Sequence, residues 1–388
     1  MTANDNSSWK IFSRTDQTPR NALERLPASP PWRPQHGGVP KAPPDVADFD
    51  GDPDLVNGVK FQITEEMEEA VNAALYLRRP LLLSGNPGTG KSSLIRAVAH
   101  QLRLGPVLRW RITSKSVLRE GLYQYDALAR LYEHQTAQAD RGKDSGTEQA
   151  DRDKDSGRIA GNDVGEFLRL GPVGTALYPR TGDISGTGKR YSWPRALLID
   201  ELDKSDIDLP NDLLHVLEEG SFEIPELMRQ RASTEPATPR TSKVLFWNGG
   251  PNERMEIKGG KVECDQFPFV VITSNSEREF PAPFLRRCIQ LTIEDPKGDR
   301  LREIIEAQLA MKLGPDGKSA QLNEGGTPIP ISDSEGRSLL EIFEEARDKD
   351  AKLAVDQLMN ALYLVISDKT GQADKKRLTD LLYRSLGT

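Results

Sequence analysis

The sequence predicts a three-layer α/β fold in which helices cover both faces of a five-stranded parallel sheet, followed by a small α-helical domain. Five stretches have the composition of strands, namely residues 81–83, 107–112, 196–199 and 269–272 and the alternating Ile289, Leu291 and Ile293. Three of them are continuous apolar runs, which is typical of strands buried on both faces. Helical segments separate the strands, and this alternation predicts a parallel sheet. Such a sheet binds its ligand at the carboxyl ends of the strands.

The first strand runs directly into a glycine-rich loop. Its residues are Gly85, Asn86, Pro87, Gly88, Thr89, Gly90, Lys91, Ser92 and Ser93. A strand, a loop of the form G-x-x-x-x-G-K-[ST] and a helix together form a phosphate-binding loop, because the glycines let backbone N–H groups turn toward an anion. The N-terminus of the following helix adds partial positive charge. We expect Lys91 to reach the β- and γ-phosphates and Ser92 to bind Mg²⁺.

Two carboxylates, Asp200 and Glu201, follow the buried strand at 196–199. We expect Asp200 to hold Mg²⁺ through water or through Ser92, and Glu201 to act as the base that polarises an attacking water. Acidic residues after a strand also favour the N-terminus of a helix, so the pair alone is ambiguous. The phosphate-binding loop in the same chain favours the catalytic interpretation.

Asn275 follows the next strand and is expected to lie between the loop and the carboxylates. There it could orient the water and contact the γ-phosphate, and the alternative is an ordinary turn residue. Arg286 and Arg287 precede the last strand. Adjacent arginines commonly form surface ion pairs, but in a ring this edge would face the nucleotide of the next subunit. An arginine placed there stabilises transition-state charge, and we assign that role to Arg287 with Arg286 in support.

Composition divides the chain into three parts. Residues 1–59 are rich in proline and favour a disordered leader, with a docking peptide anchored by Trp32 as the alternative. Residues 60–294 contain the predicted sheet, and residues 295–388 have helical periodicity with four expected helices.

Two inserts interrupt the α/β part. A charged, repetitive segment near 136–162 has no apolar face and is expected to be solvated and disordered. A second insert near 222–268 is expected to be extended. Within it, Gly259 and Gly260 separate two alternating arms, which indicates a β-hairpin.

The bulk composition limits the classes of partner. The net charge of −7 disfavours broad electrostatic binding of nucleic acid. No apolar stretch approaches the ~20 residues of a membrane span, and the first residues lack a signal-peptide pattern. Cys264, Cys288 and the four histidines have neither disulfide nor metal-site spacing. We therefore expect a cytoplasmic protein without a membrane partner.

Taken in order, the loop at 85–92, the pair Asp200-Glu201, Asn275 and the pair Arg286-Arg287 resemble the AAA+ ATPases. The finer resemblance is to the MoxR-like branch, and it is carried by segments 71–75, 80–85, 171–177, 198–204, 273–277 and 284–287. The resemblance implies a P-loop ATPase domain with a helical lid, and ATP and Mg²⁺ as cofactors. It also implies a homo-oligomeric ring, usually a hexamer, that hydrolyses ATP between subunits.

For such a ring the resemblance implies an ATP-driven motor that remodels a protein client. MoxR-like proteins often work beside von Willebrand factor A-type partners and can occur in bacterial conflict systems. A nucleotide-gated switch or scaffold is the alternative. A nucleic-acid-dependent motor is disfavoured by the acidic charge balance.

Overall fold

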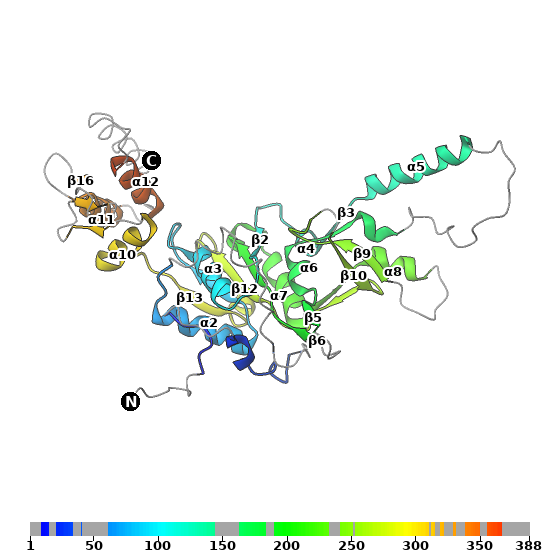
Figure 1. Ribbon diagram of the computed structural model, residues 1–388, viewed down its shortest axis with the longest axis horizontal. Helices are drawn as coiled ribbons and strands as arrows, with labels where there is room; N and C mark the ends of the chain where they lie inside the picture. The colour runs from blue at the N-terminus through cyan, green and yellow to red at the C-terminus, as the bar shows by residue number, and fades with distance from the viewer. Residues whose placement is uncertain are drawn as a thin grey trace.

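The computed structural model describes residues 9–14, 21–33, 40, 61–143, 163–183, 190–232, 241–250, 253–309, 312–314, 319–321, 329–330, 338–349 and 355–366. A five-stranded sheet forms its centre (Figure 1). In spatial order the strands are β13 (Ile289–Thr292), β1 (Leu81–Ser84), β12 (Phe269–Ser274), β7 (Ala196–Asp200) and β2 (Leu108–Arg111). Every neighbouring pair is parallel, so the predicted sheet is confirmed.

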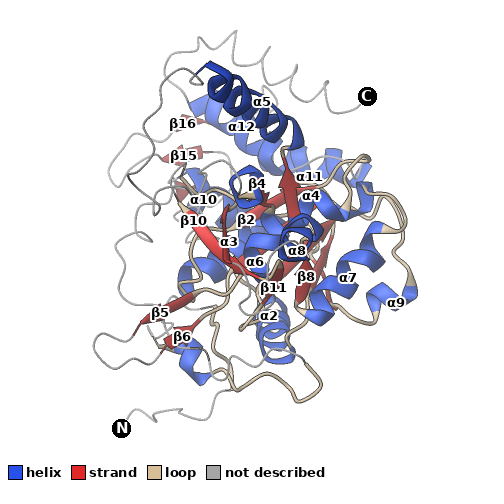
Figure 2. Cartoon of the chain, turned by 90° about the vertical axis from the view of Figure 1, so that its right-hand side faces the viewer, coloured by secondary structure: helices blue, strands red, loops and turns tan. Residues whose placement is uncertain are grey.

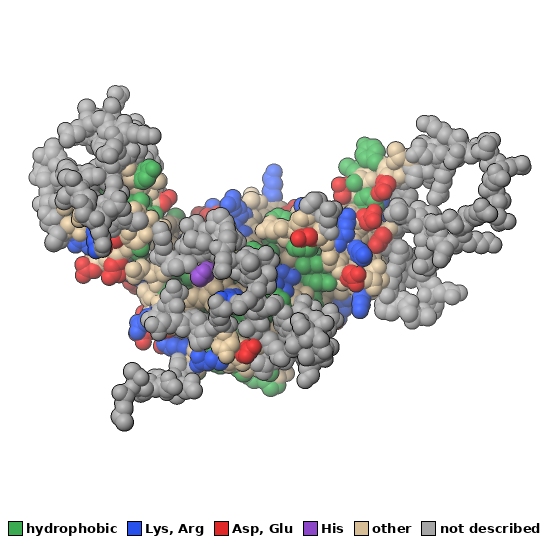
Figure 3. Space-filling view, in the orientation of Figure 1, with side chains coloured by type: hydrophobic (Ala, Val, Ile, Leu, Met, Phe, Trp, Pro, Cys, Tyr) green, Lys and Arg blue, Asp and Glu red, His purple; other side chains and the backbone are tan. Residues whose placement is uncertain are grey.

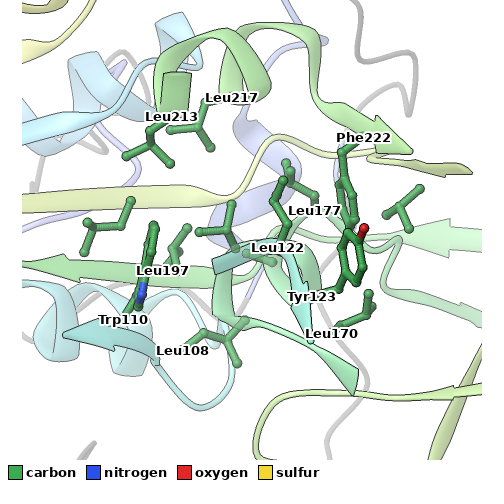
Figure 4. Close-up of a cluster of buried hydrophobic side chains, with 14 of the residues drawn as sticks. Leu108, Trp110, Leu122, Tyr123, Leu170, Leu177, Leu197, Leu213, Leu217 and Phe222 are labelled. Carbon is green, nitrogen blue, oxygen red and sulfur yellow. The ribbon is translucent and has the colours of Figure 1, made fainter. Parts of the chain in front are cut away.

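Alternate side chains of these strands enter two different cores. Leu81 and Leu83 belong to one core, whereas Leu82 belongs to the other, which Figure 4 shows around Leu197 and Leu213. This division follows from the two-residue period of a strand. The first core is covered by α2 (Glu65–Leu77) and α3 (Lys91–Gln101), and the second by α6 (Pro172–Leu177) and α7 (Leu209–Glu219). The result is the predicted helix–sheet–helix sandwich.

Part of the proline-rich leader packs on helix α2, which corrects the expectation of disorder for residues 9–14 and 21–33. Phe12 and Leu23, the latter in the short helix η1 (Ala22–Arg25), are buried in the same core as α2. The side-chain oxygen of Asn72 accepts hydrogen bonds from the backbone N–H groups of Ile11 (2.8 Å) and Phe12 (3.1 Å). Trp32, the expected anchor of a docking peptide, is 73% exposed. Apart from residue 40, the remainder of the leader lies outside the described residues.

A second sheet lies beside the first, with the strand order β10-β9-β4-β3. Its strands are β3 (Tyr123–Tyr125), β4 (Leu168–Leu170), β9 (Thr241–Leu245) and β10 (Arg254–Lys258). The Gly259-Gly260 turn forms as predicted, with positive φ angles of 65° and 77°. It joins β10 to β11 (Lys261–Glu263), but β10 pairs with β9 and β11 with β8 (Ser221–Glu223). The predicted pairing is therefore wrong, because alternation assigns residues to faces and does not choose the partner strand.

The charged insert begins as a helix rather than as a disordered segment. Helix α5 (Ala127–Lys143) extends into it and projects from the end of the molecule near β3 (Figure 1), while residues 144–162 lie outside the described part. Leu128, Leu131 and Tyr132 on this helix are exposed, and Figure 3 shows hydrophobic surface at the same end. The remaining short elements are α4 (Leu118–Leu122), η3 (Val164–Phe167), β5 (Thr181–Asp183), β6 (Arg190–Ser192) and α8 (Pro225–Ala232).

Three of the four helices expected after residue 295 are present. They are α10 (Gly298–Leu309), α11 (Leu339–Lys349) and α12 (Val355–Ile366), which pack around Leu301, Phe343 and Leu358. The fourth, expected at 378–382, lies outside the described residues. A small sheet of β14 (Lys312–Leu313), β15 (Ser319–Gln321) and β16 (Ile329–Pro330) was not predicted, because its strands are too short to show a period. Among the described residues, no helix combines the length and apolar character needed to span a membrane.

Candidate active site

The glycine-rich loop adopts a conformation that its glycines make possible. Gly85, Gly88 and Gly90 have φ angles of 145°, 80° and 87°, which side-chain-bearing residues rarely adopt. At Gly85 an added Cβ would collide with the carbonyl oxygen of Ile293, and at Gly90 it would lie 2.6 Å from the Phe61 ring. Both positions therefore require glycine for space as well as for backbone angle.

The other loop residues hold its ends. The Asn86 side chain donates a hydrogen bond to Oδ2 of Asp295 (2.8 Å), and Thr89 Oγ1 donates to the carbonyl oxygen of Asn86 (2.9 Å). Pro87 lies in the turn and Ser93 in the first turn of α3. The loop is thus fixed to the segment after β13 on one side and to α3 on the other.

Lys91 points back into the loop. Its Nζ donates hydrogen bonds to the carbonyl oxygens of Gly85 (2.6 Å) and Asn86 (2.9 Å) and to Oδ1 of Asn275 (2.8 Å). Burial lowers the pKa of Lys91, although the nearby carboxylates, with Asp203 foremost, oppose this shift. Its hydrogen bonds to the loop carbonyls place the ammonium group inside the loop, where it could contact a bound phosphate.

Asp200 ends β7 with both carboxylate oxygens engaged. Oδ1 accepts a hydrogen bond from Thr273 Oγ1 (2.7 Å) and lies 3.4 Å from Ser92 Oγ, while Oδ2 accepts from Nε (3.1 Å) and Nη2 of Arg109. Burial raises the pKa of Asp200, but the hydrogen bonds from Arg109 and Thr273 outweigh it and leave the pKa below its ordinary value. The carboxylate is therefore ionised and fixed in orientation.

Glu201 follows in a left-handed backbone conformation, with φ of 60°. Its N–H donates to Thr273 Oγ1 (2.8 Å). Oε1 accepts a hydrogen bond from Nδ2 of Asn275 (3.2 Å), and Oε2 accepts one from Nζ of Lys204 (2.8 Å) in the short helix η4 (Leu202–Lys204). The side chain is 40% exposed, so water can reach it. Asn275 thus connects Lys91 to Glu201 and lies between the loop and the carboxylates.

Three further residues hold the functional side chains in place at the carboxyl ends of the strands, and they were not identified from the sequence. Thr273 bridges Asp200 and Glu201, and Arg109 pairs with Asp200. Buried Asp203 accepts the backbone N–H groups of Asn275 (2.9 Å) and Glu277 (3.1 Å) through Oδ2, which fixes the turn after β12. The signals were present but weak: a hydroxyl at the end of an apolar run, a charge inside an edge strand, and a second acid after Asp200-Glu201.

The donor set at this edge fits Mg²⁺. The hydroxyl of Ser92 and the carboxylate of Asp200 offer oxygen atoms, which Mg²⁺ prefers, and they face each other across 3.4 Å. In the described part of the chain no group of three or more His, Cys, Asp and Glu side chains is arranged to hold a metal. Such a pair suits an ion that obtains its other ligands from nucleotide phosphates and water.

Arg286 and Arg287 lie at the opposite, amino-terminal end of the strands. They follow α9 (Ala282–Leu285), which lies beside α7 (Figure 2), and Nε of Arg287 forms an ion pair with Oε1 of Glu218 (2.9 Å). Ile289, the first residue of β13, is level with Leu81, the first residue of β1. The arginines thus stand about 13 Å, one strand length, from the loop that follows β1. Within one chain they are not brought to the phosphate-binding loop.

The comparison with protein families concerns the start of the α/β domain. Residues 81–135 match the family model described as "ATPase family associated with various cellular activities (AAA)". The likeness is to the AAA+ ATPases. The matched segment begins with β1 and includes Lys91 and Arg109, but it ends before Asp200, Glu201 and Asn275. No curated protein matches the sequence.

Two solved structures are similar in outline. NtrX from Brucella abortus, in complex with ADP, is 13% identical with a TM-score of 0.37, and the match covers 86% of this chain and 56% of that one. Domain III of the replication initiation protein DnaA from Thermotoga maritima is 16% identical with a TM-score of 0.35, covering 86% of this chain and 98% of that one. The chain thus spans little more than half of the NtrX chain. Likenesses at these TM-scores support no conclusion about function.

Proposed function

We propose that the chain is a MoxR-like AAA+ ATPase that hydrolyses ATP at the subunit interfaces of a homo-oligomeric ring and uses the energy to remodel or assemble a protein client. The phosphate-binding loop holds the triphosphate, and Lys91 exchanges its loop carbonyl partners for phosphate oxygens. Bound Mg²⁺, held by Ser92 and Asp200, would offset charge on the phosphates. Glu201 accepts a proton from the attacking water, and Asn275 holds that carboxylate in place.

The observation that carries this proposal is the chain of hydrogen bonds from Lys91 through Asn275 to Glu201. It links the phosphate-binding side chain to the base across β1, β12 and β7, three adjacent strands. A loop that only bound nucleotide would not need the Glu201 carboxylate to be held by Asn275, the residue expected to contact the γ-phosphate. The exposure of Glu201 leaves room for the water that hydrolysis consumes.

The decisive experiment compares wild type with Glu201→Gln in a steady-state assay of phosphate release. We expect turnover to fall about 100-fold or more, because a glutamine cannot accept the proton. Binding of fluorescent ATP should be retained. Glu279→Gln, the same change at an exposed position of the loop after Asn275, serves as the control and should hydrolyse at the wild-type rate. A Glu201→Gln protein with full turnover would refute the assignment of the base.

The ring is supported by the position of Arg287, which cannot reach the loop of its own chain. Arg287→Ala should bind ATP but lose hydrolysis by about 10³-fold or more if it completes a neighbour's site. Mixing it with Lys91→Ala should restore part of the activity, because mixed interfaces pair an intact loop with an intact Arg287. Arg169→Ala, an exposed arginine on β4, is the control. Mixed rings that form without regaining activity would contradict the shared site.

The same variants can be used to identify the protein client. A ring of Glu201→Gln should retain ATP and therefore hold its client, so it is a suitable trap for affinity capture. Recovery of a von Willebrand factor A-type protein with the trap, and its absence with Lys91→Ala, would support the MoxR-like assignment.

A further inference from the structure

The Asp200 carboxylate, expected to serve Mg²⁺, is paired with an arginine. Arg109 lies on β2 beside β7, and its Nε and Nη2 both donate to Oδ2 of Asp200. The opposite oxygen, Oδ1, is held by Thr273 and faces Ser92. The guanidinium thus takes the carboxylate oxygen that points away from the serine.

This arrangement has an electrostatic consequence for magnesium. A guanidinium at hydrogen-bond distance offsets the charge of Asp200, and so reduces its attraction for a divalent cation nearby. The Arg109 side chain is 34% exposed and that of Asp200 is 11% exposed, so water screens this pair only in part. Magnesium bound at Ser92 and Oδ1 would therefore meet a carboxylate whose charge Arg109 already offsets through Oδ2.

A merely structural role explains the contact less well. Strands β2 and β7 are already held in register from Leu108 to Arg111 by their parallel pairing, which continues in the hydrogen bond from the N–H of Ile112 to the carbonyl oxygen of Asp200. The ion pair is not needed to join these strands. It is placed at the carboxyl edge of the sheet, where the cofactor is expected.

We propose that Arg109 is a positioning residue that holds Oδ2 of Asp200 and offsets the charge of the carboxylate, and that it thereby weakens the magnesium dependence of nucleotide binding. This inference rests on the proposed function, because it needs a nucleotide at the loop. It assigns Arg109 no contact with the reacting atoms. Its effect acts through Asp200.

The test measures binding and does not depend on hydrolysis. The full chain is titrated with ADP carrying a fluorescent N-methylanthraniloyl group, once with excess EDTA and once over a series of Mg²⁺ concentrations. For Arg109→Gln the ratio of the Kd in EDTA to the Kd in Mg²⁺ should rise about fivefold, and half-saturation should need less Mg²⁺. Arg111→Gln removes an exposed arginine two residues along the same strand and should leave the ratio unchanged.

Arg109→Lys keeps the charge but loses the contact through both Nε and Nη2, so its ratio of Kd values should lie between those of wild type and Arg109→Gln. If Arg109→Gln does not fold, Arg109→Lys is the variant that tests the inference. An unchanged ratio in a folded Arg109 variant, or a ratio that falls, would overturn the inference. The proposed function fails separately, if wild type binds neither ADP nor ATP.

Discussion

Thr273 is the residue on which the geometry of the two acidic side chains depends most. The residue is 1% exposed, and its hydroxyl accepts the N–H of Glu201 at 2.8 Å and donates to Oδ1 of Asp200 at 2.7 Å. Thr273→Val keeps the shape of the side chain and removes both hydrogen bonds. Of the two groups left behind, Asp200 keeps the donors of Arg109, whereas the N–H of Glu201 has no replacement among the described residues.

The magnitude follows from that difference. The full penalty for a buried N–H group without a partner is about 1–3 kcal/mol, but the bond of the Glu201 N–H is only part-buried, so we expect the free energy of unfolding to fall by about 1 kcal/mol. Because Glu201 is held in a left-handed conformation beside this bond, its carboxylate should also lose its position. A displacement of the base by about 1 Å reduces the rate by up to about 100-fold, so kcat should fall 10- to 100-fold while ATP binding changes little.

Urea unfolding and steady-state phosphate release measure the two effects on the same preparation. Thr292→Val makes the same chemical change at an exposed threonine of β13, whose hydroxyl lies 3.0 Å from that of Ser84, and should change neither quantity by much. A Thr273→Val protein with wild-type stability and wild-type turnover would refute the reasoning, since both effects derive from one hydroxyl.

Three other outcomes follow from the packing and the charges. Phe12→Ala should lower the free energy of unfolding by about 3–5 kcal/mol because the ring is fully buried, whereas Trp32→Ala, at 73% exposure, should cost less than about 0.5 kcal/mol; equal effects in urea unfolding would contradict the docked leader. Gly90→Ala should weaken binding of fluorescent ADP because of its φ of 87° and the Phe61 ring beside it. Gly250→Ala should not, because the nearest atoms to the added carbon are 3.7 Å away. The lowered pKa of Asp200 contributes stability that is present above the ordinary carboxyl pKa and lost as the pH falls through the lowered one, so the fall in stability below about pH 4 should be shallower in Asp200→Asn.

The sheet and most of the candidate site were predictable because both depend on strand ends. Asp200 ends a strand, Lys91, Glu201 and Asn275 follow one within a few residues, and parallel strands bring their carboxyl ends together. The expected position of Asn275 also depends on which strands are neighbours, and no residue pattern fixes that order. The spatial order places β12 between β1 and β7, and this order sets Asn275 between Lys91 and Glu201.

Residues that act through others were not predictable in the same way. A threonine in an apolar strand and an arginine in an edge strand are ordinary sheet residues, so Thr273 and Arg109 gave only a weak signal. The leader was misjudged for a related reason. Ile11 and Phe12 lie in an extended segment without helical or strand periodicity, and their burial depends on Asn72, a polar residue on the facing side of α2 that accepts their N–H groups.

The separation between the loop and Arg287 limits how this chain could hydrolyse a nucleotide. Parallel pairing places Leu81 level with Ile289. The phosphate-binding loop and Arg287 therefore lie at opposite ends of neighbouring strands, in a sheet that is packed on both faces. No rotation of side chains spans about 13 Å, because an extended arginine reaches roughly half of that. If Arg287 takes part in the reaction, a second copy must present it. If a solitary chain hydrolyses ATP at full rate, Arg287 is a surface residue paired with Glu218. In that case Lys91 and the magnesium held by Ser92 and Asp200 would have to stabilise the charge of the transition state.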